Sequence, residues 1–246
     1  MKFSEMPYTR PDYAAISEKL DKLTQQLRDA GSAEDQTAVY REYETLISHL
    51  STQTTLAYVR HTVDTNDKFY EEENDYNDQQ TPLMEEKVKT FQKALMDSPF
   101  RGELENLLGS LLFENMELEM KGFSPEIVPL MQEENKLASD YQKLYASAQI
   151  PFMGETVTGA QLGPYKESTD RATRRAALEA EGSFFDQHRE EFDQLFDKLV
   201  KNRTEQAKKL GFESFVELGA IRRQRNCYTP ADVASFRQQV VRDLVP

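Results

Sequence analysis

The chain has 246 residues and a mass of 28.4 kDa, which fits one large domain or two small ones. It carries 30 Lys and Arg residues against 43 Asp and Glu residues, a net charge of −13. This excess of acid argues against a protein that binds duplex nucleic acid or an anionic membrane surface, because both need surplus basic side chains. No run approaches the roughly 18 apolar residues of a membrane span, and no signal peptide is apparent. Cys227 is the only cysteine, so no intrachain disulfide can form, and we expect a soluble cytoplasmic protein.

The first half of the chain predicts long amphipathic helices. Only 10 Gly and 10 Pro punctuate the sequence, too few for an all-β protein, and apolar residues recur at spacings of three and four. We expect one helix from Pro11 to Gly31 and a second from Ser32 to about Asp64. An acidic segment covers residues 64–78, and Pro82 is expected to begin or interrupt a helix that ends near Asp97.

The following residues continue this pattern with one exception. A single helix is expected over residues 101–121, and the next is expected to reach about Tyr145. Residues 150–159 mix β-formers with turn residues and predict a short hairpin that turns around Gly154 and Glu155. The predicted fold class is therefore mainly α: a bundle of long helices with one short β-hairpin near residues 149–158.

Three helices are expected in the last part of the chain. Ser168, Thr169 and Asp170 cap a long helix that runs from about Arg171 to Leu210 and stops at Gly211. A short helix follows over residues 213–219. Thr229 and Pro230 cap the last one, which is expected to be still running at Pro246.

The sequence contains no complete active site, so we name no catalytic or metal-binding residue, and substrate-binding residues are left unknown. His49, His61 and His188 lie far apart and lack a zinc-ligand spacing, which favours structural or surface roles. Cys227 has no neighbour that would activate it as a nucleophile. The acidic run Glu71–Glu73 lacks the pattern of a calcium loop, so we expect it to be solvated.

Residues 201–225 carry seven bases and three acids, a local charge of +4 in an acidic chain. A solvated face with intramolecular ion pairs is the favoured interpretation. Two alternatives remain, in which the segment faces the acidic first half or an anionic ligand. A nucleic-acid site has the least support, because no binding motif accompanies the charge.

One stretch of the sequence has a specific pattern around the predicted stop at Gly211. The residues that carry it are Leu199, Arg203, Ala207, Leu210, Gly211, Phe212, Ser214 and Phe215. They resemble the L-x-x-x-R-x-x-x-A-x-x-L-G-F-x-S-F/Y signature of the oligoendopeptidase F and thimet-oligopeptidase group of zinc metallopeptidases. Residues 149–155, 161–177 and 228–233 also resemble passages of that group, so the resemblance covers about residues 149–241.

The resemblance implies a protease that hydrolyses short peptides through a zinc-bound water, inside a channel between two helical halves. It implies an N-terminal helical domain over residues 1–148, and over 149–246 the hairpin and first helices of a helical zincin-type catalytic domain. The family's H-E-x-x-H motif and the later glutamate ligand do not occur in this chain. Zinc ligands are therefore expected in a C-terminal catalytic part outside it. The partners implied are that part and oligopeptide substrates, and the chain alone is expected to be inactive.

Truncation predicts that the helices after residue 149 expose an apolar surface, so that the isolated chain self-associates or is less stable than a globular protein of its length. The affected side chains would be Phe184, Phe185, Phe192, Leu195, Phe196 and Leu199. The alternative function, a non-enzymatic helical scaffold or interaction protein, predicts instead a complete chain without zinc or peptide hydrolysis. Its partner would bind the acidic face of residues 64–78 or the basic face of residues 201–225.

Overall fold

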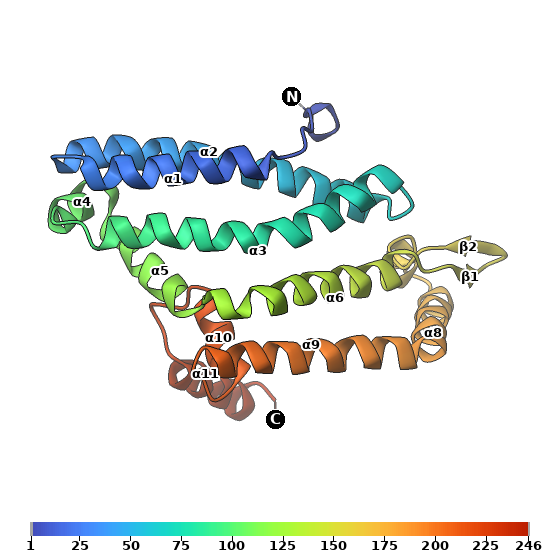
Figure 1. Cartoon of the computed structure of the whole chain (residues 1–246). Coiled ribbons are helices and arrows are strands. Elements are labelled where there is room, and N and C mark those ends of the chain that lie inside the picture. Colours follow the sequence, from blue (N-terminus) through green and yellow to red (C-terminus); the bar gives the residue numbers. More distant parts are fainter. Residues whose placement is uncertain (1, 246) are drawn as a thin grey trace. The chain divides into compact units, whose positions relative to one another are not determined.

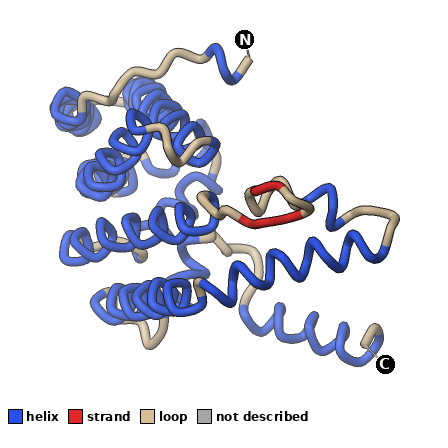
Figure 2. Tube along the Cα trace, turned by 90° about the vertical axis from the view of Figure 1, so that its right-hand side faces the viewer, coloured by secondary structure: helices blue, strands red, loops and turns tan. Residues whose placement is uncertain are grey.

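The computed structural model describes residues 2–245 and confirms a mainly helical fold with one short two-stranded sheet (Figures 1 and 2). The elements in chain order are η1 Phe3–Glu5, α1 Tyr13–Asp29, α2 Ala33–Val63, α3 Lys68–Met96, α4 Arg101–Leu108, α5 Ser110–Lys121, η2 Pro125–Ile127, α6 Val128–Ala146, β1 Ile150–Phe152, β2 Glu155–Val157, α7 Gly163–Lys166, α8 Arg171–Gln187, α9 Arg189–Lys209, α10 Phe215–Arg222 and α11 Pro230–Asp243.

The chain divides into two compact units that are each assembled from three stretches. Unit 1 contains the described residues up to Ile16 together with Thr45–Met84 and Val128–Arg203. Unit 2 contains Ser17–Glu44, Glu85–Ile127 and the described residues from Thr204 onward. Helices α1, α2, α3 and α9 contribute residues to both units.

Side-chain caps fix several helix starts where the sequence predicts them. The Ser32 hydroxyl accepts a hydrogen bond from the Asp35 amide at 3.1 Å, ahead of α2. Asp170 accepts bonds from the backbone amides of Ala172 and Thr173 and begins α8. The predicted stop at Gly211 is also confirmed, since this glycine has a φ of 84°.

Helix α3 begins well before Pro82, so the expectation that Pro82 begins or interrupts a helix is wrong. Asp67 caps the helix, with its Oδ1 accepting a bond from the Phe69 amide at 3.0 Å. Pro82 has no N–H to donate to the carbonyl of Asp78, four residues earlier. Asn135 of α6 donates to that carbonyl instead, at 3.0 Å. The helix therefore continues through the proline because a side chain replaces the missing donor.

Two predicted helices are each divided into two. Gly109, with a φ of 92°, separates α4 from α5 within the predicted helix 101–121. His188 lies between α8 and α9 within the predicted helix 171–210, with non-helical backbone angles of −105° and 15°. The short helix after Gly211 is α10, and α11 ends at Asp243 rather than running to the last residue.

The predicted hairpin is present, but its turn lies one residue earlier than expected. Ile150 pairs with Val157 and Phe152 with Glu155 in an antiparallel register. Met153 and Gly154 form the turn, with φ values of 50° and 84°. Two successive residues with positive φ match the two-residue turn that follows the right-handed twist of a hairpin.

Unit 1 has two apolar clusters. One contains Ala148, Ile150, Phe152, Val157, Leu162, Ala177 and Phe184. The other contains Tyr13, Leu50 and Met84, with Ile16 and Tyr76 packed against it. In unit 2 the rings of Tyr43 and Phe91 stack with centroids 4.0 Å apart. Part of the apolar stripe after residue 149 is exposed, as expected: Phe196 is 64% exposed, whereas Phe184 and Leu199 are buried.

The bond between Asn135 and the Asp78 carbonyl can be tested with a double-mutant cycle. Asn135→Ala removes the donor and should lower the free energy of unfolding by about 1 kcal/mol. In a Pro82→Ala background the backbone N–H introduced at position 82 can donate to the same carbonyl, so the cost of Asn135→Ala should fall. Denaturant titration of the four chains measures this, and equal costs in both backgrounds would contradict it.

Gly159 lies where a side chain would strike Tyr145. A Cβ built on Gly159 would lie 2.5 Å from the Tyr145 hydroxyl oxygen, which bonds Glu181 at 3.0 Å. Gly159→Ala should therefore destabilise the protein by about 1–3 kcal/mol. A Cβ built on Gly182 in α8 would meet no atom within 4 Å, so Gly182→Ala should stabilise by about 0.5–1 kcal/mol. Thermal melts measure the stability of both variants. Equal changes in melting temperature would contradict a clash between a Cβ at position 159 and Tyr145.

Candidate functional site

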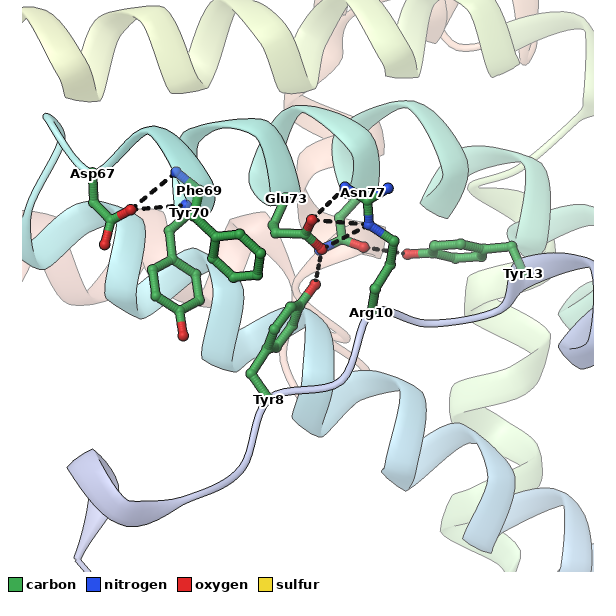
Figure 3. Close-up of polar contacts among 8 residues, drawn as sticks. All are labelled: Tyr8, Arg10, Tyr13, Asp67, Phe69, Tyr70, Glu73 and Asn77. Carbon is green, nitrogen blue, oxygen red and sulfur yellow. Dashed lines mark hydrogen bonds and ion pairs between the residues drawn. The ribbon is translucent and has the colours of Figure 1, made fainter.

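The N-terminal segment before α1 lies along helix α3 and forms a polar site of unit 1 with it (Figure 3). Tyr8 and Arg10 are two residues apart in extended chain, so both side chains can reach one side of the segment. Glu73 and Asn77 are four residues apart and share one face of α3. The two-residue repeat of the extended segment and the four-residue spacing on the helix therefore bring these four side chains together.

Glu73 is the centre of this contact. Its carboxylate accepts a hydrogen bond from the Tyr8 hydroxyl, and its two oxygens lie 2.9 and 3.0 Å from the Arg10 Nε. Tyr13 donates from its hydroxyl to the Asn77 Oδ1 at 2.9 Å. Glu73 is 2% exposed, so it is a buried charge that these donors compensate.

The pKa shifts follow from this geometry. The hydrogen bond from Arg10 holds the pKa of Glu73 below its ordinary value, although burial opposes the effect. Burial, and then the bond to Glu73, raise the pKa of Tyr8 far above its ordinary value. Tyr8 therefore remains a hydrogen-bond donor at neutral pH, and the arrangement attaches the segment to α3 rather than providing a general acid or base.

Two contacts with α2 complete the attachment of the segment. The Thr9 amide donates to the Gln53 Oε1 at 2.8 Å, and Arg60 donates to the Met6 carbonyl at 2.6 Å. A pocket of about 320 Å³ opens beside Thr9 and Arg10. Its other lining residues are Pro11, Asp12, Ala15, Ile16, Leu46, His49, Leu50 and Gln53.

A second polar cluster lies between α3 and α6. The Asp78 carboxylate accepts a bond from the Ser139 hydroxyl at 2.7 Å and one from Asn74 at 3.1 Å. Burial raises the pKa of Asp78, and the bond from Ser139 partly offsets this. Within residues 2–245, the buried Nδ1 of His61 and Nδ2 of Asn77 have no hydrogen-bond partner. The side chains of Asp78, Ser139 and Asn74 therefore have partners, whereas His61 and Asn77 each keep one buried nitrogen without a partner among the described residues.

The expectation of a solvated acidic run is wrong for two of its three residues. Glu73 is buried, and Glu71 pairs with Lys68 at 2.7 Å and also with Lys143. The bond from Lys143 is the main reason that the pKa of Glu71 falls to about 2. Only Glu72 is exposed, as expected.

The base-rich segment is divided between paired and unpaired cations. Lys201 pairs with Asp197, and Arg203 pairs with Glu134 at 2.6 Å. Arg222 donates to Gln206 at 2.5 Å. Arg223 and Arg225 have no carboxylate partner among the described residues. The ion pairs and these two exposed arginines together fit the favoured interpretation, a solvated face with intramolecular ion pairs.

The histidines and the cysteine do not come together. His49 is exposed at the rim of the 320 Å³ pocket, His61 is buried, and His188 contacts Glu191 at 2.8 Å. Cys227 is an exposed free thiol. Residues 2–245 contain no group of three or more His, Cys, Asp or Glu side chains placed to hold a metal ion. Among the helices described, none is long and apolar enough to cross a membrane.

Comparison with known proteins decides the family. The pattern described as "Peptidase M3 N-terminal domain" matches residues 3–123. PZ peptidase A, solved with an inhibitor, matches the whole chain at 45% identity with a TM-score of 0.95. A protein assigned as an oligoendopeptidase F matches the whole chain at 46% identity, with a TM-score of 0.95. Another protein so assigned, from Bacillus anthracis str. Ames, matches the whole chain at 41% identity, also with a TM-score of 0.95. The chain belongs to the M3 peptidase family.

Within the family, the chain corresponds to an N-terminal portion. It spans 44% of PZ peptidase A and of the first oligoendopeptidase F, and 45% of the Bacillus anthracis protein. An oligoendopeptidase F from Enterococcus faecium shares the fold at 17% identity, with a TM-score of 0.57 over 85% of this chain and 46% of that one. No curated protein matches the chain significantly.

The contribution of Glu73 to the stability of this chain can be tested by substitution. Glu73→Gln removes the charge that Arg10 and Tyr8 bind, and should lower the free energy of unfolding at pH 7 by about 1–3 kcal/mol. Because the pKa of Glu73 is lowered by folding, its stabilisation is present above the ordinary Glu pKa of about 4.3 and is lost as pH falls through the folded-state pKa. The difference between wild type and variant should therefore shrink in acid.

Glu72→Gln is the matched control, since it removes the neighbouring charge from an exposed position. Its effect should lie within about 0.5 kcal/mol at either pH. Urea titrations at pH 7 and pH 3 measure both variants. Equal effects of the two substitutions would show that Glu73 does not hold the N-terminal segment.

Proposed function

We propose that the chain is the N-terminal part of a zinc-dependent oligopeptidase, a metalloendopeptidase that hydrolyses short peptides. The supporting observation is 41–46% identity over the whole chain to PZ peptidase A and to proteins assigned as oligoendopeptidase F. That the structure of PZ peptidase A includes an inhibitor also fits a peptidase. Identity of this extent makes a shared function a reasonable inference, although fold alone would not.

In this proposal the chain provides scaffold and channel wall. Residues 1–148 form an N-terminal helical domain, and residues 149–246 supply the hairpin and first helices of the catalytic domain. Peptides would enter a channel between two helical halves, which would exclude folded proteins by size. A cytoplasmic location fits an enzyme restricted to short peptides.

Zinc does not fit the residues described in this chain, because none of their His, Cys, Asp and Glu side chains form a ligand group. We therefore assign the metal to a C-terminal catalytic part, and we derive no step through it. The chain alone is expected to be inactive. The alternative, a non-enzymatic helical scaffold, predicts no zinc and no hydrolysis by the native gene product.

The test uses the native gene product, purified from its source without protease exposure. We expect bound zinc in elemental analysis and cleavage of internally quenched peptides of about ten residues. Removal of zinc with a chelator should abolish cleavage, and added zinc should restore it. The 246-residue chain is the control and should cleave nothing. A native product that lacks both zinc and peptidase activity would overturn the proposal and favour the scaffold.

A further inference from the structure

A small pocket in unit 2 lies between helices α10 and α11 and the loop that joins them. Val216 and Ala220, four residues apart, share a face of α10. Val233 and Arg237 have the same spacing on α11. The loop contributes Arg225, Tyr228 and Thr229, and Pro230 begins α11. The pocket measures about 190 Å³, less than the roughly 300 Å³ or more of a typical drug-sized site.

The pocket combines an apolar floor with two cations. Val216, Ala220, Pro230 and Val233 provide aliphatic surface, and Tyr228 adds an aromatic ring. Arg225 and Arg237 are both exposed lining residues, and neither has a carboxylate partner within residues 2–245. No acidic residue lines the pocket. In a chain with a net charge of −13, this is a place where an anion would be attracted rather than repelled.

The loop that carries Arg225 is held in place from several directions. The Arg225 amide donates to the Ala220 carbonyl at 3.2 Å, and its guanidinium lies 5.6 Å from the centre of the Tyr228 ring. Asn226 contacts Asn115 of α5 at 2.8 Å, and Gln224 donates to Glu119 of α5 at 2.7 Å. These contacts already order the loop, so a ligand that binds there loses less affinity to the entropic cost of ordering it.

The start of α11 is equally well defined. The Thr229 hydroxyl accepts a bond from the Asp232 amide at 3.3 Å, and the Asp232 carboxylate accepts one from the Thr229 amide at 2.7 Å. This reciprocal capping box fixes where the helix begins. It therefore also fixes the face on which Val233 and Arg237 lie. The Asp232 carboxylate is directed to the backbone and is not a lining group.

We propose that this pocket binds the C-terminal carboxylate of a short peptide whose last side chain is apolar, with Arg225 and Arg237 on the carboxylate and the side chain on the aliphatic floor. An arginine guanidinium presents paired donors that match the two oxygens of a carboxylate. A single apolar side chain suits the small volume. The inference rests on the proposed function, because an oligopeptidase has peptide substrates and products with free carboxylates.

Binding to the 246-residue chain tests the inference directly. The probes are an N-acetylated pentapeptide that ends in Leu with a free carboxylate and the same peptide as its C-terminal amide. In titration calorimetry at low salt we expect the acid to bind at least about tenfold more tightly than the amide, because charged hydrogen bonds are lost with the amide. Added salt should weaken binding of the acid.

Three arginine variants locate the site. Arg225→Gln and Arg237→Gln should each weaken binding of the acid about tenfold. Arg223→Gln is the matched control, because it removes the same charge from an exposed residue of the same loop that does not line the pocket. It should change affinity less than about twofold. Val216→Glu, at a position 73% exposed, should abolish binding without unfolding the chain.

Equal affinity for acid and amide, equal losses for Arg223→Gln and Arg225→Gln, or no binding at millimolar peptide would each overturn the inference. Circular dichroism of each variant identifies any that fail to fold. The outcome is separable from that of the proposed function. Zinc-dependent hydrolysis by the native product without binding to the chain would reject this pocket alone, and binding without hydrolysis would reject the enzymatic function alone.

Discussion

The missing N–H of Pro82 is the constraint around which the middle of unit 1 is built. It leaves the Asp78 carbonyl inside α3 without its helical donor, and Asn135 of α6 supplies one. The next carbonyl, that of Gln79, accepts a bond from Gln132 of α6 at 2.7 Å. The Asp78 carboxylate accepts a hydrogen bond from the hydroxyl of Ser139, which is also on α6. A residue that would normally break a helix is thus the place where α3 is joined to α6.

Another face of α3 holds the N-terminal segment through Glu73 and Asn77 (Figure 3). Helix α3 therefore connects segments that are far apart in sequence, and these contacts explain part of its acidic composition. Glu71, Glu73 and Asp78 each have specific partners. A buried carboxylate without such donors would be costly, so the partners and the helix depend on one another.

Local chemistry determined how much of the fold could be predicted. Ser32, Asp170 and Gly211 act on their own neighbours, so their roles as helix caps and stop are readable from sequence. The burial of Glu73 could not be predicted, because its partners Tyr8 and Arg10 lie more than 60 residues away. The start of α3, by contrast, is capped locally by Asp67, a signal that the sequence interpretation missed. The same limit applies to the pocket between α10 and α11. The sequence reveals a surplus of bases there, but only the structure separates Arg225 from the paired Arg203. The family resemblance was found over residues 149–241, whereas the family pattern matches residues 3–123, where long helices offer few distinctive motifs.

We propose that this chain is part of a larger peptidase, because it spans less than half the length of its relatives. The intact mass of the native gene product, purified from its source without protease exposure, tests this most directly. We expect a mass well above 28.4 kDa, with an H-E-x-x-H motif in the additional sequence. A mass of 28.4 kDa would contradict it.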